Sequence, residues 1–382
     1  MQEYLFLLGN TPTLSLAEIN SVFPDLNCSL IHPQVAFGSS ASFDPHTAIR
    51  RLGGTIKILK PIEQHSLLST EEAEEKLLEI LRVHPKAISK LQFGIGEIGR
   101  DHLQPIEEAV IKAALQKEGI PARYLLDSRA GLSAAILSHK KAIIEFLLIN
   151  NETATFIAET LAVQDVDNWT NRDRNKPYAD SKKGMLPPKV ARMMVNLALS
   201  TTEPNSTIVC DPFCGSGTVL LEASVLGCSI MGSDADPVAI DGTAKNLRWL
   251  NSEYNLEKEY TLRNADVTKV QFPANSVSHL VTEPFLGKPG PREHQLPGIF
   301  KGLQKLYLGA FKHWRNFLQD GATVVIVMPL VTDFAETFSL RSFIDGLTVL
   351  GYTTSSEPIV YARPNATVQR EIYQLKYTKQ SK

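Results

Sequence analysis

From residue 187 onward, short apolar runs alternate with longer segments that carry apolar residues on one helical face. The runs expected to form strands are 207–211, 229–233, 260–264, 278–282, 322–328, 352–361 and 370–377. The segments expected to form helices are 187–199, 217–227, 237–250, 300–317 and 333–349. This alternation favours an open, mostly parallel sheet with helices on both faces and a ligand site at the carboxyl ends of its strands. The last two runs have no helix between them, which predicts an antiparallel hairpin at the sheet edge.

The chain before residue 187 has a different pattern. Short strands and helices alternate over residues 1–62, which predicts a small ferredoxin-like α+β unit in which Ser15 and Glu18 have the spacing of a capping box. A second unit, expected over residues 63–160, begins at another capping box, Ser69 to Glu72. Residues 161–186 lack apolar periodicity and predict an irregular connector.

The connector and the start of the following helix are basic. The basic residues between 170 and 192 are Arg172, Arg174, Lys176, Lys182, Lys183, Lys189 and Arg192, against the acidic Asp173 and Asp180. That local excess of five positive charges lies in a chain with 39 Lys and Arg, 41 Asp and Glu, and a net charge of −2. A basic coat over the whole protein is excluded, so any nucleic-acid contact must be local. The segment is either a solvated linker or a hinge that contacts phosphates.

Composition excludes several other classes of protein. The four cysteines, at positions 28, 210, 214 and 228, form no C-x-x-C pair, so neither a zinc site nor a disulfide framework is expected and a reducing cytoplasm is the default location. No apolar run approaches the ~18 residues that span a bilayer. The first ten residues contain no Lys or Arg, so a signal peptide is not expected.

The segment Val209–Thr218, read VCDPFCGSGT, carries the strongest chemical signal in the chain. An apolar strand is followed by Asp211 and then by a glycine-rich turn that opens a helix. Glycines let a ligand approach the backbone, and N–H groups at a helix start suit polar ligand groups. The segment is neither a Walker A loop nor G-x-G-x-x-G, and a purely structural turn is the alternative. Acidic residues also end the next two strands, at Asp234 and Asp266.

The octapeptide D-P-F-C-G-S-G-T closely resembles the cofactor loop of S-adenosylmethionine-dependent amino-methyltransferases that act on nucleic acids. The resemblance implies S-adenosylmethionine as the cofactor and no metal. It implies cofactor contacts from Asp211, Phe213, Gly215, Gly217, Thr218, Asp234, Ala235 and Asp266. Asp234 would accept hydrogen bonds from the ribose hydroxyls and Asp266 from the adenine amino group. Asp236, which precedes Pro237, is interpreted as the N-cap of the next helix.

The fourth strand ends in Thr282-Glu283-Pro284-Phe285, where these enzymes have Asp/Asn-Pro-Pro-Tyr/Phe. In that motif an acid or amide and a proline-fixed carbonyl accept hydrogen bonds from the target amine, and an aromatic residue packs on the flipped base. The resemblance implies Glu283, Pro284 and Phe285 as catalytic residues, with Glu283 as acceptor and Phe285 as the stacking residue. Glu283 replaces the usual Asp, and Phe285 the second Pro. A register shifted by one residue would put Thr282 in the acidic position.

The resemblance extends beyond this domain. The connector motifs R-D-x-x-K-P and G-M-L-P-P-K-V-A and the N-terminal YLFLLGNTPTLSLAEI are similar to THUMP-containing tRNA guanine-N2-methyltransferases, which methylate guanosine 10. The resemblance implies an α/β chain with a ferredoxin-like domain (1–62), a THUMP-like RNA-binding domain (63–160), a basic linker (161–186) and a seven-stranded Rossmann-like methyltransferase domain (187–382). It implies RNA contacts from Arg172, Arg174, Lys176, Lys182, Lys183 and Lys189.

The implied function is methyl transfer to the N2 amine of a tRNA guanosine in the cytoplasm, without a membrane. Oligomeric state and the need for an activator subunit stay open. Two alternatives also stay open. The first is a DNA amino-methyltransferase, which shares the two motifs. The second is a catalytically silent partner that binds RNA or cofactor, which the altered Glu283-Pro284-Phe285 sequence would fit.

Overall fold

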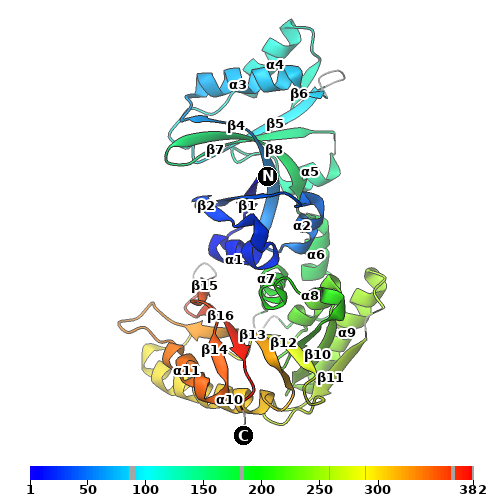
Figure 1. The fold of residues 1–382 in the computed structure, drawn as a ribbon, viewed down its shortest axis with the longest axis vertical. Helices are drawn as coiled ribbons and strands as arrows, with labels where there is room; N and C mark the ends of the chain where they lie inside the picture. Colours follow the sequence, from blue (N-terminus) through cyan, green and yellow to red (C-terminus); the bar gives the residue numbers. More distant parts are fainter. Residues whose placement is uncertain are drawn as a thin grey trace. The chain divides into compact units, whose positions relative to one another are not determined.

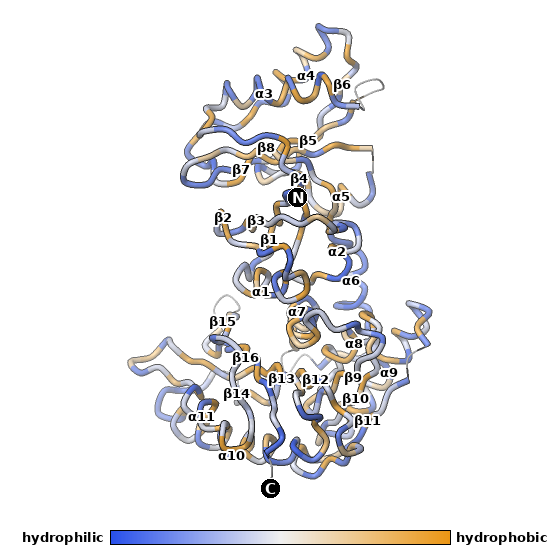
Figure 2. The backbone as a smooth tube through the Cα atoms, viewed as in Figure 1, coloured by the Kyte–Doolittle hydropathy of each residue, from blue (hydrophilic) through white to orange (hydrophobic). Residues whose placement is uncertain are grey.

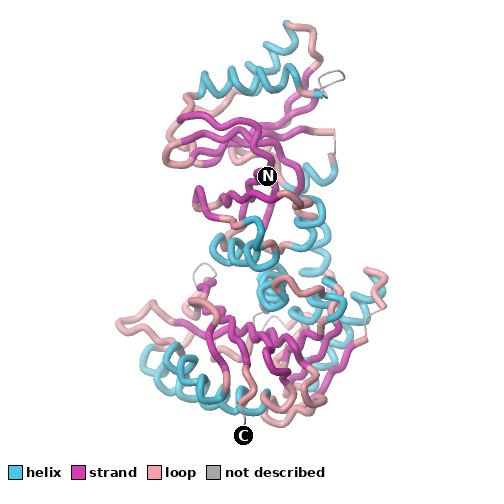
Figure 3. The backbone as a smooth tube through the Cα atoms, viewed as in Figure 1, coloured by secondary structure: helices cyan, strands magenta, loops and turns pink. Residues whose placement is uncertain are grey.

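The computed structural model describes residues 1–85, 91–140, 142–180, 185–257, 259–288, 290–362 and 366–380. They form two compact units, which are described separately below. The N-terminal unit comprises Met1–Asn20 and Pro24–Trp169, and the C-terminal unit comprises Ser21–Phe23 and Thr170–Lys382. Figure 1 labels the elements, and Figure 3 shows that each unit contains its own β-sheet.

The N-terminal unit contains one continuous sheet in the order β2-β3-β1-β4-β8-β7-β5-β6. Its strands are β1 (Gln2–Leu8), β2 (Ser29–His32), β3 (Val35–Ser40), β4 (Thr55–Ser66), β5 (Leu91–Ile98), β6 (Ala122–Tyr124), β7 (Ile144–Asn150) and β8 (Ala154–Val163). The predicted boundary between residues 62 and 63 falls inside β4, which pairs with β1 on one side and β8 on the other. The ferredoxin-like and THUMP assignments stay predictions.

The helices of this unit are α1 (Pro12–Val22), α2 (Pro45–Arg51), α3 (Thr70–Val83), α4 (Glu108–Lys117) and α5 (Ala134–His139). Apolar residues of α3 and α4, among them Leu77 and Leu115, share a buried cluster with Phe93 of β5 and Phe146 of β7. The capping box that opens α3 is confirmed, because Ser69 and Glu72 each accept the other's backbone N–H. These two helices therefore cover one face of the β5–β7 region.

The capping box predicted at Ser15 and Glu18 is wrong. Helix α1 begins at Pro12, so Ser15 lies inside it and donates to the carbonyl of Thr11. The carboxylate of Glu18 is fully buried and accepts the backbone N–H groups of Gly53 and Gly54 at 2.8 and 2.9 Å. Glu18 thus satisfies donors 35 residues away, a role that local spacing cannot indicate.

The C-terminal unit contains a mixed sheet in the order β11-β10-β9-β12-β13-β16-β14, with β15 paired to β16. Its strands are β9 (Ile208–Asp211), β10 (Ser229–Asp234), β11 (Tyr260–Asn264), β12 (Val277–Thr282), β13 (Leu318–Leu330), β14 (Tyr352–Thr354), β15 (Ile359–Tyr361) and β16 (Gln369–Tyr377). Pairing is parallel from β11 to β13 and antiparallel around β16, as the alternation predicts. The predicted strand 352–361 is divided into β14 and β15, so that over the described residues the sheet has eight strands where the sequence predicted seven.

Helices cover both faces of this sheet. They are α7 (Pro188–Leu199), α8 (Thr218–Leu226), α9 (Pro237–Glu253), α10 (Leu296–Trp314) and α11 (Arg341–Asp345). Along β13, Val324 and Ile326 belong to a cluster that includes residues of α10, whereas Val325 and Val327 point to the opposite face and are equally buried. A strand buried on both faces is typical of a parallel sheet between two helical layers.

The predicted helix 333–349 is confined to α11 and a 3₁₀ turn, Gly346–Leu350. Val331 and Phe338 pair as an antiparallel bridge, with backbone hydrogen bonds of 2.9 and 3.0 Å in the two directions. The bridge closes a loop over the intervening residues, so the first half of the predicted helix cannot form.

The predicted irregular connector contains helix α6 (Val166–Arg174). Arg172 on this helix is buried, and its Nε donates to Glu222 Oε1 of α8 at 2.7 Å. Arg192 of α7 donates to the second oxygen of the same carboxylate at 3.0 Å. Figure 2 shows most of α7 in the hydrophobic colours, and its residues from Val190 to Leu199 are all buried. One buried acid therefore joins three helices through two arginines.

Replacing Glu222 with Gln should lower the free energy of unfolding by roughly 3–5 kcal/mol, because two buried guanidinium groups would lose their counter-charge. Urea unfolding measures this loss. The matched control is Glu253→Gln: Glu253 is exposed and accepts from Asn171 of the same helix α6. That control should lose no more than about 0.5 kcal/mol. Equal losses in the two variants would show that the buried network contributes nothing beyond a surface contact.

Candidate active site at the switch point of the C-terminal sheet

The direction of strand addition reverses at β9. The chain proceeds from β9 to β10 and β11 on one side and then places β12 on the other. The carboxyl ends of β9 and β12 meet at this switch point, where Thr282 Oγ1 donates to Asp211 Oδ1 at 2.6 Å. Open α/β sheets bind ligands in the crevice outside such a point. Both residues are buried, so this hydrogen bond forms the floor of the candidate site.

The loop after β9 has the geometry that its glycines permit. Gly215 has a φ of +51° and Gly217 a φ of +82°, and Gly217 is the N-cap of α8, whose first residue is Thr218. A Cβ on Gly217 would lie 2.8 Å from the side chain of Thr243. A Cβ on Gly215 would meet nothing closer than 4.0 Å, so the space above this residue is open. The loop therefore offers its backbone to a ligand at Gly215.

The strand-end acids support this loop. Asp234 accepts the N–H of Gly215 on Oδ2 and that of Asp236 on Oδ1, both at 2.9 Å. Each carboxylate oxygen has a second lone pair, so Asp234 can still accept a ligand hydroxyl. Ala235 is exposed beside it. The N-cap role of Asp236 is confirmed, because its side chain accepts from Val238 N at 2.9 Å.

Asp266 lies two residues beyond the end of β11 and is exposed. Its Oδ1 accepts both the N–H and the hydroxyl of Thr268, and these hydrogen bonds lower the pKa of Asp266. The neighbouring Ala265 N–H donates to the carbonyl of Asp234 at 3.0 Å, so the two strand ends are adjacent. Asp211, the glycine loop, Asp234 and Asp266 are thus brought together. Phe213 is half-buried in the same loop and donates its N–H to Asp211 at 3.1 Å.

One residue that organises the loop has no sequence signal. Asn246 of α9 donates to the carbonyls of Ser216 and Tyr178 at 2.8 and 2.9 Å and accepts the N–H of Tyr178. A Cβ on Gly242, one turn earlier in α9, would lie 2.1 Å from the ring of Tyr178. Asn246 and Gly242 therefore seat the end of the connector beside the glycine loop.

The end of β12 places the predicted catalytic residues next to this crevice. Pro284 is buried, whereas the ring of Phe285 is 56% exposed. Tyr307 of α10 donates its hydroxyl to the carbonyl of Phe285 at 2.7 Å, which fixes the loop beneath the exposed ring. Phe285 also lines a groove of about 640 Å³, together with Lys288, Ile299 and Leu306. An exposed aromatic ring beside a groove suits a planar ligand.

Glu283 is half-buried and pairs with an arginine that sequence reasoning missed. Arg370 Nε on β16 donates to Glu283 Oε1 at 2.5 Å. The two residues are 87 positions apart in the sequence. No spacing rule connects them, and only the assembled sheet shows their proximity. Oε2 of Glu283 has no hydrogen-bond partner among the described residues.

The basic residues of the connector differ in their exposure to solvent. Arg172 and Lys176 are buried, and burial is the largest influence on the pKa of Lys176, which it lowers. Neither side chain is available to a phosphate, which corrects their predicted RNA role. Arg174 is exposed and Lys189 is half-buried, while Lys182 and Lys183 lie outside the described residues. The RNA contacts of these last four stay predictions.

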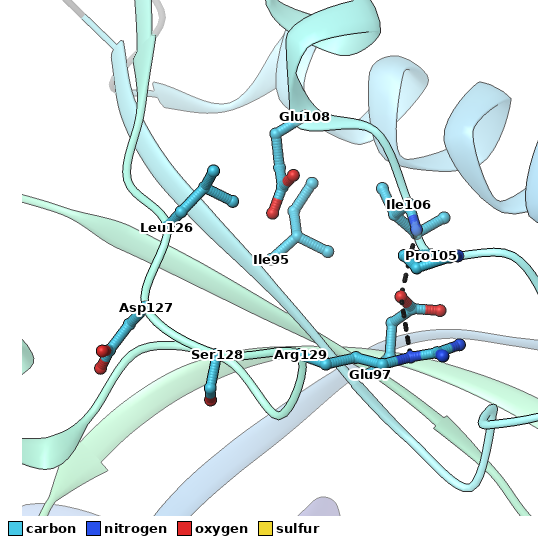
Figure 4. A pocket seen from close by; sticks show the side chains of 9 residues that line it. All are labelled: Ile95, Glu97, Pro105, Ile106, Glu108, Leu126, Asp127, Ser128 and Arg129. Atoms are coloured by element: carbon cyan, nitrogen blue, oxygen red, sulfur yellow. Dashed lines mark hydrogen bonds and ion pairs between the residues drawn. The ribbon is translucent and has the colours of Figure 1, made fainter.

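A smaller cavity, of about 290 Å³, lies in the N-terminal unit (Figure 4). Its lining contains three carboxylates, from Glu97, Glu108 and Asp127, and one guanidinium, from Arg129. Glu97 accepts the N–H of Ile106, and burial raises the pKa of Glu108. An acidic lining repels phosphates, so we place no RNA contact in this cavity.

No helix among the described residues is long and apolar enough to cross a bilayer. Within the same residues, no group of three or more His, Cys, Asp or Glu side chains could hold a metal ion. All four cysteines are buried, and none of them forms a disulfide.

Residues 177–343, which include the glycine loop and the Glu283-Pro284-Phe285 segment, match the family described as RMKL-like, methyltransferase domain. Over these residues the chain is similar to methyltransferase domains of that family. The chain is also similar to enzymes named tRNA (guanine(10)-N2)-dimethyltransferase. The relative from Pyrococcus abyssi is 36% identical over 27% of this chain and 29% of its own length. The relative from Methanocaldococcus jannaschii is 31% identical over 41% of this chain and 44% of its own length.

The chain thus spans less than half the length of these two curated relatives. Their names confirm the resemblance that the sequence motifs predicted. The solved structure of TrmN from Thermus thermophilus aligns over 99% of this chain and 100% of its own, with a TM-score of 0.58 and 17% identity. SMU.472, a putative methyltransferase complexed with SAH, aligns over 100% and 99%, with a TM-score of 0.54 and 12% identity. At these identities the structures show a shared fold.

The electrostatics of the candidate site centre on Asp211. Complete burial raises its pKa to about 7, and the negative charges of Asp234 and Glu283 contribute to the increase. The hydrogen bonds from Thr282 and from Phe213 N oppose it by stabilising the carboxylate. In the unfolded chain this carboxyl would lose its proton near its ordinary pKa of 3.8. Between the two values the folded state therefore binds the proton more tightly.

The free energy of unfolding should consequently fall as the pH rises from about 4 to about 7, and it should level off above that range. The contribution of Asp211 to this decrease is at most about 4 kcal/mol. Replacing Asp211 with Asn should remove that decline. Urea unfolding across this pH range measures both slopes. Asp266→Asn is the matched control. The lowered pKa of Asp266 makes stability rise with pH, so removing this carboxylate should leave the decline caused by Asp211 in place. The assignment fails if Asp211→Asn keeps the wild-type slope.

Proposed function

We propose that this chain is an S-adenosylmethionine-dependent tRNA methyltransferase that modifies the exocyclic N2 amine of a guanosine, at a position like position 10. The observation that carries the proposal is the placement of Glu283, Pro284 and Phe285 at the switch point, beside the glycine loop and the acids of β9 and β10. The family match and the names of the curated relatives support it.

The residues at the carboxyl ends of β9, β10 and β11 fit S-adenosylmethionine. This cofactor supplies a methyl group on a positively charged sulfonium sulfur, and the carboxylate of Asp234 gives the cofactor side of the site negative charge. Asp234 would hold the ribose hydroxyls, and the free Oδ2 of Asp266 would hold the adenine amino group. The open space at Gly215 lets the ligand reach the loop backbone. The SAH bound to SMU.472, which shares this fold, gives further support.

The acceptor side of the site fits an aromatic amine. The N2 lone pair of guanine is delocalised into the ring, so the amine is a poor nucleophile. Oε2 of Glu283 would accept an N2–H and favour the pyramidal nitrogen of the transition state. The carbonyl that Pro284 fixes would accept the other hydrogen, and Phe285 would stack on the extruded base. The nitrogen would form its bond to the methyl carbon as the carbon–sulfur bond breaks, and the proton that the methylated nitrogen then loses would pass to Oε2 of Glu283. Catalysis would depend on positioning and electrostatics, because the departing thioether is neutral and needs no acid.

The tRNA itself would contact the N-terminal unit and the remaining basic residues of the connector. Arg174 is exposed and can neutralise a phosphate, and Lys182, Lys183 and Lys189 are proposed to do the same. Domain boundaries at residues 62, 160 and 186 and THUMP character for 63–160 are part of this proposal. The cytoplasm is the proposed location because the substrate is a tRNA.

The decisive experiment incubates the purified chain with methyl-labelled S-adenosylmethionine and either total tRNA or duplex DNA. We expect label in tRNA alone, recovered as N2-methylated guanosine after nucleoside digestion. Label in DNA would instead support a DNA amino-methyltransferase. Cofactor and tRNA binding without transfer would support a silent partner. Using the chain alone also shows whether a second subunit is required.

Glu283 should matter for turnover more than for cofactor binding, since it would act on the amine as the transition state forms. Glu283→Ala should lower the single-turnover rate roughly 100-fold, comparable to the loss of one oriented polar group in other active sites. Glu283→Gln keeps one acceptor oxygen and should retain partial activity. Calorimetry should show unchanged cofactor affinity for both variants. A wild-type rate in Glu283→Ala would move the acceptor role to Thr282 and shift the register of the motif by one residue.

A further inference from the structure

Arg370 is the second residue of β16 and lies near the carboxyl ends of β12 and β13. Its backbone pairs with Pro329 of β13 and with Tyr361 of β15. Because β13 lies between β12 and β16, the side chain must cross β13 to reach Glu283 Oε1, where the separation from Nε is 2.5 Å. The side chains of Arg370 and Glu283 are only 12% and 14% exposed. The pair is therefore largely shielded from water within the candidate active site.

The guanidinium is itself held from a second direction. Its central carbon lies 5.8 Å from the ring centre of Tyr361, within the range of a cation–π contact. Ladder pairing on both sides fixes the backbone of Arg370, and the aromatic ring fixes its head group. A side chain held in this way can impose an orientation on its partner.

We propose that Arg370 is a positioning residue for the acceptor carboxylate of Glu283, an inference that rests on the proposed function. Glutamate has one more side-chain torsion than the aspartate usual in this motif, so its carboxylate samples more positions unless it is held. Arg370 holds Oε1. Oε2, without a partner among the described residues, is left to accept the amine hydrogen. Displacement of an acceptor by about 1 Å can cost as much as 100-fold in rate.

Charge gives Arg370 a second function. Glu283 lies close enough to Asp211 to disfavour its ionised form, and Asp234 acts in the same direction. A third uncompensated carboxylate at these strand ends would be repelled by the other two. The guanidinium compensates the negative charge of Glu283 at the position where it would act.

The alternative is that the Arg370–Glu283 pair only stabilises the fold. The next residue of β16 forms a second ion pair that serves as a control for this alternative. Glu371, the next residue, points to the opposite face of β16, where it is fully buried and paired with Arg341 at 2.8 Å. The adjacent residues Arg370 and Glu371 thus each belong to an arginine–glutamate pair, Arg370 with Glu283 and Glu371 with Arg341. Only the Arg370–Glu283 pair lies in the candidate active site.

The test is a double-mutant cycle on the full chain with single-turnover methyl transfer to tRNA. Arg370→Met should lower the rate between about 10-fold and 100-fold, with unchanged cofactor affinity by calorimetry. In a Glu283→Gln background the same substitution should change the rate less than about 3-fold, because the charge being positioned is already absent. Arg370→Lys should recover part of the loss. Arg341→Met should lower the melting temperature without changing the rate.

Each outcome decides the proposal. Rate losses that multiply independently in the double variant would overturn it, because a structural brace acts whichever residue occupies position 283. An equal rate loss in Arg341→Met would overturn it as well, since general destabilisation would then explain both. A wild-type chain that transfers no methyl to tRNA would overturn the proposed function and this inference together. If the wild-type chain transfers methyl to tRNA and the two substitutions reduce the rate independently, the inference about Arg370 alone would be overturned.

Discussion

The hydrogen bond from Thr282 to Asp211 joins the two strands on which the candidate site depends. A fully buried carboxylate must be hydrogen-bonded, and Asp211 meets this need with a hydroxyl from β12 and an N–H from its own loop. The first bond fixes how β9 and β12 meet at the switch point, and the second bends the chain into the glycine loop. The N–H of Gly215 in this loop donates to the carboxylate of Asp234, and the N–H of Ala265 donates to the backbone carbonyl of Asp234. The three strand ends form one connected polar layer, and Glu283, the proposed acceptor, follows Thr282 directly.

Features encoded over short distances could be predicted from the sequence. The alternation after residue 187 predicts the parallel sheet, the loop composition predicts the turn at Gly215 and Gly217, and Asp236 before Pro237 predicts an N-cap. Each depends on residues within a few positions of one another, for which backbone geometry is the deciding factor. Where a local pattern competes with a distant partner, the partner decides. Glu18 has capping-box spacing but satisfies the backbone of residues 53 and 54, and the helical pattern after residue 333 gives way to the bridge between Val331 and Phe338.

The basic connector shows why a count of charges does not describe a surface. Of the seven basic residues between 170 and 192, Arg172 and Arg192 are both bound to the one carboxylate of Glu222, and Lys176 is buried. Glu222 lies 30 residues beyond the end of the segment, so a local sum cannot include it. Of the other basic residues in this segment, Arg174 is exposed, and its RNA contact and those of Lys182, Lys183 and Lys189 stay predictions. Arg172, from which the sequence predicted an RNA contact, instead stabilises the packing of α6 against α8, and Arg192 does the same for α7.

The motif at the end of β12 departs from the pattern of the enzymes it resembles, and the structure supplies a physical reason why the departure is tolerable. A longer acid could reach further than aspartate, but the added torsion would leave its carboxylate poorly defined. Arg370, held between the ladder pairs of β16 and the ring of Tyr361, removes that freedom without occupying Oε2. Short antiparallel strands at the sheet edge thus contribute to a site that the parallel strands define. β15 has only three residues, yet it places Tyr361 against Arg370, and Arg370 connects it to the acceptor. The sequence pattern presented residues 352–361 as a single edge strand, and its division into two strands lets β15 place Tyr361 beside the Arg370–Glu283 pair.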